Sequence, residues 1–411
     1  MSRVLVTGVG AVTPLGNDAR STWQALLEGR SGIDAISRFD TASFGAAVAG
    51  EVRDFQPETR LAAKDLRHLD RNVQLAAVAA LEALDDAGLA ASTPLGPTCG
   101  VVLGAASGGF SFYDEQARRF REEGPRRVSP FMISSILPDA ASGYVAILTG
   151  AQGPNLAVVA ACATGAASIG EAAAVIQRGD AEVMIAGSGE APLTPALYAG
   201  FHAMRALATP ATDPSRTCKP FDRNRDGFVL AEGAGALILE SDAHAAARGA
   251  TPYAELIGYG TSNDAFNAVA PEKTGRAPVL AIEMALRKAA VTPASVGYVN
   301  AHGTGSPLND QVETLALKRV FGEHAHRLAV SSIKSMTGHM MGAAGAVEAV
   351  ATVLALRNQI LPPTMHYEEP DPACDLDYVP NAARPVSGLD IALSTSIGLG
   401  GHNAALLFRR A

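Results

Sequence analysis

The chain has few aromatic residues and few cysteines, and both shortages restrict what it can be. Aromatic residues make up 5% of its 411 residues, with one tryptophan, whereas 41 residues are glycine. Cys99, Cys162, Cys218 and Cys374 lie far apart and form neither a CxxC pair nor a Cys/His ligand spacing. This distribution argues against a zinc site and a disulfide framework, and it fits a reducing compartment.

Long apolar runs and an excess of basic residues are also missing. No unbroken apolar stretch reaches the roughly 18 residues of a membrane span, and the chain does not open on a basic stretch followed by an apolar one. Lys and Arg number 33 against 41 Asp and Glu, a net charge of −8 that argues against a general nucleic-acid binder. We therefore expect a cytoplasmic protein that binds neither membranes nor nucleic acid, although a local basic patch can still oppose the net charge.

Several common catalytic motifs are absent. Gly8-Val9-Gly10 is followed by Thr13 where a dinucleotide-binding loop needs its third glycine, so we interpret this segment as a turn. The sequence contains no GxSxG elbow, no phosphate-binding GKS or GKT loop and no HExxH pair. These catalytic frameworks therefore have no support.

What is abundant is alanine, glycine and valine, arranged in alternating strand-like and helix-like segments. Short apolar segments predict buried strands at 4–7, 100–103, 158–161, 183–186, 297–300, 329–332 and 391–394. Alanine-rich segments predict helices at 73–87, 166–178, 279–290 and 345–358. The alternation predicts an α/β fold.

The two halves of the chain repeat one another. Three units recur in the same order, namely 73–104 with 279–302, 158–178 with 329–358, and 233–239 with 400–407. This indicates a duplicated α/β unit, with one half at 1–252 and the other at 253–411. Turns after corresponding strands converge in such an arrangement, so we expect the site to lie between the halves.

Cys162 has the features of a nucleophile. It follows an apolar segment and opens a helix of small residues, and a helix N-terminus favours thiolate over thiol. Its small neighbours permit a sharp turn like that of a nucleophile elbow. The other three cysteines are interpreted as buried apolar residues.

Two of the nine histidines, His302 and His339, lie in turns after predicted strands, among glycine, serine and threonine. A Cys-His pair can accept an acyl group as a thioester, and a second neutral imidazole can donate a hydrogen bond to a carbonyl that becomes an enolate. The glycines of loop 398–401 permit a backbone N–H to point inward, where it would form an oxyanion hole with the Cys162 N–H.

With these motifs the sequence resembles the elongating β-ketoacyl-acyl-carrier-protein synthases of the synthase II type, which are thiolase-fold condensing enzymes. The matching motifs span nearly the whole chain and are 6–16, the Cys162 elbow, 220–222, 225–228, 232–235, 300–306, 334–339, 342–345 and 398–403. The resemblance implies a thiolase fold whose two similar halves form five layers, αβαβα. It implies a homodimer, with a heterodimer as an alternative, and acyl carrier protein as the partner. No metal or redox cofactor is implied, because loss of carbon dioxide drives the condensation.

The resemblance also implies a role for each matching residue. Cys162, His302, His339 and Lys334 are catalytic, and the N–H groups of Cys162 and Leu399 form the oxyanion hole. The substrate-binding residues are Thr304, Ser306, Ser107, Phe131 and Ile397, and a structural network contains Glu348, Asp310 and Glu313. The residues that dock the carrier protein are Lys64, Arg67 and Arg205.

Charge spacing gives a second argument for docking. Arg60, Lys64, Arg67 and Arg71 fall at i, i+4, i+7 and i+11, so a helix there would present a basic stripe on one face. The resemblance implies an acidic carrier, which such a stripe would fit.

Three departures from the family bear on substrate choice. Ile397 and Leu399 stand where the family has phenylalanines, and the second of these is the gate. Ser107 replaces an isoleucine of the acyl pocket, and 139–140 replaces an Asn-Met pair near the partner subunit. We expect weaker gating and a different chain preference.

Three other functions remain open. The first is the ketosynthase of a type II polyketide or polyene system, which uses the same residues on a different chain. A catalytically silent, chain-length-factor-like partner is opposed by Cys162, because such partners generally lack the nucleophile. A degradative thiolase would carry a second catalytic cysteine in place of a histidine.

Overall fold

The computed structural model of the chain describes residues 2–89 and 94–411, and its main strands fall into two sets of five. The first set is β1 (Val4–Val12), β4 (Cys99–Gly104), β5 (Asn155–Leu156), β6 (Val183–Glu190) and β7 (Gly233–Ser241). The second set is β8 (Ala254–Asn263), β9 (Tyr298–Asn300), β10 (Ala329–Ser331), β13 (Ile391–Gly398) and β14 (His402–Arg410).

The strands pair in the same pattern in both halves of the sheet when each half is read outward from the centre. The full order is β10-β9-β13-β14-β8-β1-β7-β6-β4-β5. From β1 outward the four pairings are antiparallel, antiparallel, parallel and parallel, and the pairings from β8 outward repeat this pattern. β1 and β8 themselves pair antiparallel at only two positions, Leu5 with Glu255 and Val6 with Ala254. The two halves are therefore related by a local two-fold axis that passes between β1 and β8.

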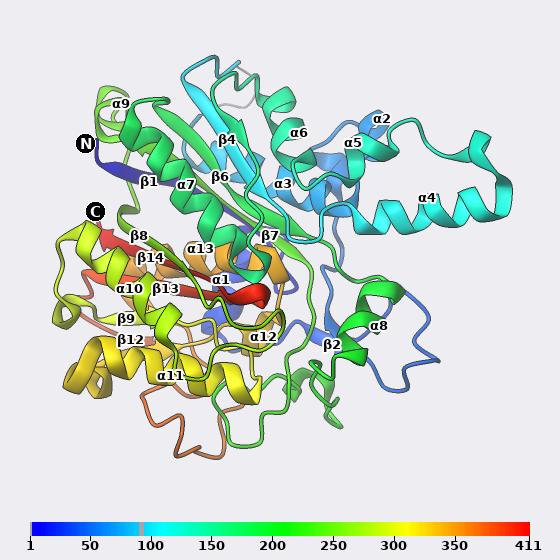
Figure 1. Cartoon of the computed structure of the whole chain (residues 1–411). Helices are drawn as coiled ribbons and strands as arrows, with labels where there is room; N and C mark the ends of the chain where they lie inside the picture. Colours follow the sequence, from blue (N-terminus) through cyan, green and yellow to red (C-terminus); the bar gives the residue numbers. More distant parts are fainter. Residues whose placement is uncertain (1, 90–93) are drawn as a thin grey trace.

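Helices complete five layers around the two strand sets (Figure 1). α3 (Arg71–Asp86) and α6 (Ala140–Thr149) cover the outer face of the first set. α10 (Arg276–Ala289) and α11 (Pro307–Phe321) lie on the outer face of the second. Between the two sets, α7 (Thr164–Arg178) packs against α13 (Ala344–Asn358). The expected αβαβα arrangement is confirmed.

Glycine and alanine allow the helices to lie directly on the strands. A Cβ added to Gly10 of β1 would lie 2.0 Å from the carbonyl oxygen of Ala79 in α3, and one added to Gly260 of β8 would lie 2.0 Å from that of Ala281 in α10. Because real Cβ atoms do not approach a carbonyl so closely, both strand positions require glycine. The glycine excess thus has the same structural cause in each half.

The two central helices meet at their first turns. A Cβ on Gly165 of α7 would lie 2.5 Å from the backbone nitrogen of Ala346, and a Cβ on Gly345 of α13 would lie 2.8 Å from that of Ala166. Each glycine therefore admits the backbone of the other helix. This contact brings the N-termini of α7 and α13 to the centre of the molecule.

Smaller elements surround this framework. The helices are α1 (Ala19–Leu27), α2 (Ala63–Leu66), α4 (Phe110–Glu123), α5 (Met132–Ile136), α8 (Pro195–Ala203), α9 (Asp242–Ala247) and α12 (Lys334–Thr337). The two-stranded sheets are β2 (Ile33–Ala35) with β3 (Val48–Gly50), and β11 (Ile360–Leu361) with β12 (Arg384–Pro385). In Figure 1, α4 projects away from the body. Within 2–89 and 94–411, no helix combines the length and apolar character that crossing a membrane requires.

One predicted strand is wrong. The expected strand at 158–161 is replaced by the short strand β5, and 157–160 run to the helix without strand pairing. The N–H of Ala160 donates to the Thr164 side chain at 2.9 Å rather than to a neighbouring strand, and Val159 is half exposed. An apolar run alone does not distinguish such a connection from a buried strand. The other six predicted strands and the four predicted helices are confirmed.

Candidate active site

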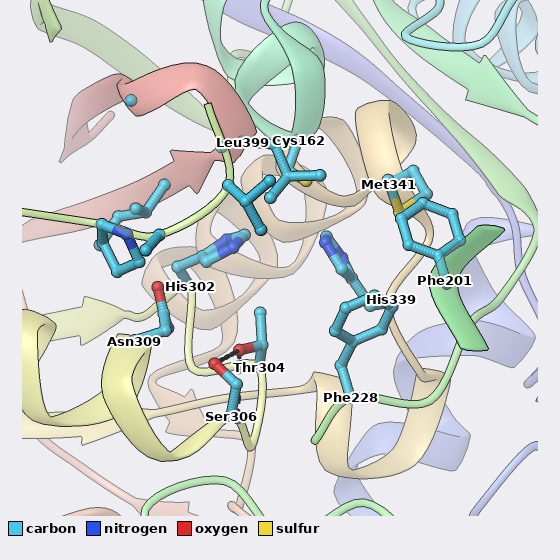
Figure 2. Close-up of a pocket in the computed structure, with 16 residues that line it drawn as sticks. Cys162, Phe201, Phe228, His302, Thr304, Ser306, Asn309, His339, Met341 and Leu399 are labelled. Atoms are coloured by element: carbon cyan, nitrogen blue, oxygen red, sulfur yellow. Dashed lines mark hydrogen bonds between the residues drawn. The ribbon is translucent and has the colours of Figure 1, made fainter. Parts of the chain in front are cut away.

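A cavity of about 100 Å³ lies between the two halves, at the N-terminus of α7. Seven of the predicted site residues line it, and they are Cys162, His302, His339, Thr304, Ser306, Ile397 and Leu399. Figure 2 shows the two imidazoles and the Leu399 side chain grouped around Cys162. The first half supplies the cysteine, and the second supplies the six other predicted residues.

Cys162 sits on a strained turn in front of α7. It belongs to the 3-10 turn Ala161–Ala163, in which Ala161 has a φ of 48°, a conformation that costs a non-glycine residue free energy. The backbone N–H groups of Leu399 and of Cys162 itself favour the ionised form of the thiol. Burial raises the pKa of the Cys162 thiol to about 11, although these N–H groups and the Lys334 charge lower it. The site therefore holds a buried thiol whose ionisation is opposed by burial and favoured by two backbone N–H groups and one cation.

The loop that supplies the Leu399 N–H depends on one glycine. A Cβ on Gly398 would lie 3.0 Å from the backbone nitrogen of Cys162 and 3.1 Å from the carbonyl oxygen of Ala160. This spacing is tighter than side chains normally adopt, so Gly398 allows the end of β13 to approach the elbow. The predicted inward-pointing N–H is thus built on a close approach of two backbones.

The two histidines meet at nearly a right angle. Their ring centroids are 5.3 Å apart, with an interplanar angle of 87°, and both side chains are buried. Burial lowers the pKa of each ring well below 6.5, and the positive charge of Lys334 lowers it further. The His339 ring also packs edge-to-face against the Phe228 ring, with ring centroids 5.3 Å apart and an interplanar angle of 88°. Both rings are therefore neutral at physiological pH.

Lys334 fixes the orientation and tautomer of His302. Its Nζ donates to the His302 carbonyl oxygen at 2.6 Å and to the Glu348 carboxylate, and it lies 3.3 Å from His302 Nδ1. An ammonium group only donates, so Nδ1 accepts and the proton of the ring is on Nε2. Lys334 and Glu348 are both fully buried, and burial raises the pKa of Glu348 against the opposing effect of Lys334. Lys334 is therefore committed to three acceptors.

Two buried carboxylates of α11 hold the turn that carries His302. Glu313 accepts from the N–H groups of His302 and Gly303, both at 2.8 Å, and from the Thr395 hydroxyl at 2.7 Å. Asp310 accepts from the Gly305 N–H at 3.2 Å. Burial raises the pKa of Glu313 to about 7. The predicted network residues thus shape loop 302–306 from behind.

The cavity has one polar wall and one apolar wall. On the polar side, Thr304 and Ser306 share a hydrogen bond of 3.1 Å, and Asn309 follows them on α11 (Figure 2). The apolar side is formed by Phe201, Phe228, Met341, Ile397 and Leu399. A wall of each kind suits a substrate with a polar arm and an apolar chain.

The match to known sequences decides the family. Residues 1–245 match the sequence model described as "Beta-ketoacyl synthase, N-terminal domain", and 253–368 match "Beta-ketoacyl synthase, C-terminal domain". The chain belongs to the β-ketoacyl synthase family. The family resemblance, the fold and the class of enzyme expected from the sequence are confirmed.

Individual relatives agree with this assignment over their whole length. A "3-oxoacyl-[acyl-carrier-protein] synthase 2" of Staphylococcus aureus is 47% identical over 408 residues, covering 99% of this chain and 98% of the relative. The protein of the same name from Synechocystis sp. is 46% identical over 408 residues, with the same coverage of both chains.

Solved structures are similar over the full chain as well. A type II PKS ketosynthase, in complex with its acyl-carrier protein and bound to the hexaketide, superposes with a TM-score of 0.92 at 35% identity, covering 100% of both chains. A β-ketoacyl synthase from Burkholderia phymatum superposes with a TM-score of 0.91 at 33% identity, again covering 100% of both chains.

In this β-ketoacyl synthase, two predicted substrate-binding residues lie outside the cavity lining. The Ser107 hydroxyl donates to the buried carboxylate of Glu190. Phe131 is 44% exposed and stacks on His68, with ring centroids 4.0 Å apart, in a separate groove of about 630 Å³. Neither side chain touches the cavity within this single chain.

The prediction that four basic residues between 60 and 71 share one face of a single helix is wrong. α2 covers only Ala63–Leu66 and α3 begins at Arg71, because Asp70 caps α3 by accepting from the Asn72 N–H. Arg60 pairs with Asp85 at 2.6 Å. Arg71 pairs with the buried Glu232 at 2.8 Å.

The three residues chosen for carrier docking are free of such pairs. Lys64, Arg67 and Arg205 form no ion pair within the part of the chain that the structure describes. Arg205 is exposed and has a φ of 55°, directly after α8. Of the four residues of the predicted stripe, Lys64 and Arg67 remain available to a partner.

Sequence reasoning missed seven residues of the cavity, which are Phe201, Phe228, Val269, Ala270, Pro271, Asn309 and Met341. Asn309 carried a signal, because it lies three residues after Ser306 and so one helical turn further along the same wall. The others come from separate segments with no local pattern. Cys99, Cys218 and Cys374 are free and buried, as predicted, and burial raises the pKa of each thiol to about 12.

Proposed function

We propose that this β-ketoacyl synthase joins an acyl chain held on Cys162 to a malonyl group carried by acyl carrier protein. Carbon dioxide is lost, and the product is a 3-oxoacyl-acyl carrier protein of fatty-acid chain elongation. The observation that carries the proposal is the cavity that Cys162 shares with Leu399 and with the two buried, neutral imidazoles.

In the first step Cys162 takes the acyl chain. Its sulfur attacks the thioester carbonyl, the new carbon–sulfur bond forms, and the carrier thiol leaves with the proton that Cys162 gives up. The negative charge that develops on the carbonyl oxygen is stabilised by the backbone N–H groups of Cys162 and Leu399, two residues that line the cavity.

In the second step the two histidines stabilise an enolate. The malonyl carbon–carbon bond breaks, carbon dioxide leaves, and the electron pair passes to the thioester carbonyl, whose oxygen accepts from His302 Nε2 and from His339. Each preorganised donor is worth about 3 kcal/mol of transition-state stabilisation. The carbanion then attacks the acyl carbon on Cys162, a carbon–carbon bond forms, and the thiolate leaves and regains a proton.

Lys334 is proposed to act through the histidines. Together with burial, its charge keeps both rings neutral, and its contacts with the His302 carbonyl and Nδ1 leave the ring proton on Nε2. Glu348 balances the buried charge. We assign Lys334 to this positioning task rather than to a Schiff base.

The substrate arm and the carrier are assigned by position. The hydroxyls of Thr304 and Ser306 suit the amides of a phosphopantetheine arm, and Lys64, Arg67 and Arg205 suit an acidic carrier. The carrier-bound substrates supply everything that the reaction consumes, so the proposed reaction uses neither a metal nor a redox cofactor. We place the reaction in the cytoplasm.

A homodimer is part of the proposal. The edge strand β5 carries Leu156, which is 52% exposed, and beside it lie exposed apolar side chains of α5 and α6 such as Ile133 and Ile147. An unpaired edge next to an apolar face favours a second copy. A heterodimer is the alternative, since one similar structure is a ketosynthase/chain length factor, at 34% identity and a TM-score of 0.92. We further propose that 1–252 and 253–411 are the two units of the duplication.

The second candidate function is the ketosynthase of a type II polyketide system. It is favoured by the similarity to the ketosynthase bound to a hexaketide. One experiment tests both candidates: acyl carrier proteins loaded with saturated chains of several lengths, and with polyketide chains, are offered to the enzyme. The mass of Cys162 and the condensation with malonyl carrier are then followed. Loading by saturated chains alone supports elongation, polyketide loading supports the second candidate, and no loading overturns both.

A further inference from the structure

The molecule contains a second elbow that repeats the backbone of the cysteine elbow. The turn Met341–Ala343 precedes α13 as Ala161–Ala163 precedes α7, and the φ of Met341 is 47° against 48° for Ala161. Gly342 therefore corresponds to Cys162. Where one half has a nucleophile, the other has no side chain.

A buried carboxyl occupies the space beside this second elbow. A Cβ on Gly342 would lie 2.8 Å from Oε1 of Glu190, the last residue of β6. Glu190 accepts from the N–H groups of Ala106 and Ser107 and from the Ser107 hydroxyl. It is fully buried and has no ion-pair partner among residues 2–89 and 94–411. An unpaired carboxyl thus lies in the interior without a cation to offset it.

Glu190 and Cys162 are separated by the contact between the two elbows. The carbonyl oxygen of Gly342 lies 2.9 Å from where a Cβ on Gly165 would stand, in the first turn of α7. Across this contact the carboxylate raises the pKa of the Cys162 thiol, whereas Lys334 lowers it. Asp70 is the other charged group that acts on Glu190. Two buried charges of opposite sign therefore have opposing effects on the nucleophile.

We propose that Glu190 is a positioning residue whose carboxylate, set against the second elbow, restrains formation of the Cys162 thiolate. Removing its charge makes Cys162 more reactive. Because burial raises the pKa of Glu190 to about 7, the carboxyl is neutral in mildly acidic solution and ionised above neutrality. Glu190 therefore restrains thiolate formation only above neutrality. The inference rests on the proposed function only in taking Cys162 as the nucleophile.

The test measures the reactivity of the thiol directly. The full chain and its Glu190→Gln variant are treated with iodoacetamide between about pH 5.5 and 9, and alkylation of the Cys162 peptide is followed by mass spectrometry. Near pH 6 the two rates are expected to agree, since Glu190 is already protonated. Above neutrality the variant is expected to react about five- to tenfold faster, which corresponds to about 1.0–1.4 kcal/mol of electrostatic free energy. A rate ratio that is the same at every pH overturns the proposal.

Ser107→Ala is the matched second variant. The Ser107 hydroxyl lowers the pKa of Glu190, so its loss moves the inflection of the alkylation profile to higher pH without removing it. This variant keeps the carboxyl, so it decides the matter if Glu190→Gln does not fold. An inflection that stays in place overturns the proposal. Alkylation needs no carrier protein, so failure of acyl loading with an intact pH effect would refute only the condensation.

Discussion

The imidazole rings of His302 and His339 stand at 87° to each other with centroids 5.3 Å apart. Rings in this arrangement can aim their N–H groups at one oxygen from two directions, whereas stacked rings would not. His302 arrives from the turn after β9 and His339 from the turn after α12, so the pair depends on two separate elements.

The first prediction concerns pH. Because burial and Lys334 hold the pKa of both histidines well below 6.5, both rings remain neutral as the pH falls from 8 to 6. The condensation step is therefore expected to show no inflection near pH 6.5, where an ordinary histidine would gain its proton. Single-turnover rates of the acylated enzyme with malonyl carrier measure this. A fall by half near pH 6.5 would contradict the neutral pair.

The second prediction separates the two half-reactions. Cys162→Ala removes the atom that carries the acyl chain but leaves the histidine donors in place. Elongation is expected to vanish, while release of carbon dioxide from malonyl carrier continues. Radiolabelled carbon dioxide and product mass are measured in parallel. Full elongation by this variant would refute Cys162 as the nucleophile.

The third prediction concerns the buried ion pair. Lys334→Met leaves the Glu348 carboxylate without a partner in the interior, which is expected to lower the free energy of unfolding by about 3–5 kcal/mol. Adding Glu348→Gln is expected to restore most of this loss in urea unfolding, because no lone charge then remains.

Condensation should distinguish stability from chemistry in the same variants. The double variant is expected to fold well and yet condense slowly, because Lys334 no longer fixes the tautomer of His302. Recovery of activity together with stability would mean that Lys334 serves the fold alone.

The fourth prediction concerns carrier docking. Lys64→Glu with Arg67→Glu is expected to raise the KM for acyl carrier protein roughly tenfold at low salt with little change in kcat, since charge pairs at a rim act on encounter. The matched control is Arg60→Glu, because Arg60 already pairs with Asp85. An equal effect of the control would place docking elsewhere.

The chemistry of the site was predictable because each catalytic residue lies in a short local motif. Cys162, His302 and His339 each follow a strand or turn among small residues, and each motif could be recognised alone. The apolar wall of the cavity was not predictable, since Phe201, Phe228 and Met341 reach the cavity from three unrelated segments. Their roles arise only when the chain is folded.

Errors in the sequence analysis also had physical causes. Spacing places Arg60 and Arg71 on one face only if a helix runs between them, and the cap at Asp70 breaks it. The segment at 157–160 is apolar enough for a strand, but Thr164 takes the N–H that a neighbouring strand would need. Both errors come from backbone hydrogen bonds that composition does not show.

The division of the site between two halves related by a two-fold axis has a consequence for the chain during its synthesis. Cys162 leaves the ribosome well before His302 and His339, and the Leu399 N–H comes last. Until then the thiol has neither its second backbone donor nor its imidazoles. A chain that ends before His302 therefore contains the nucleophile but lacks both imidazoles and the Leu399 N–H of the site.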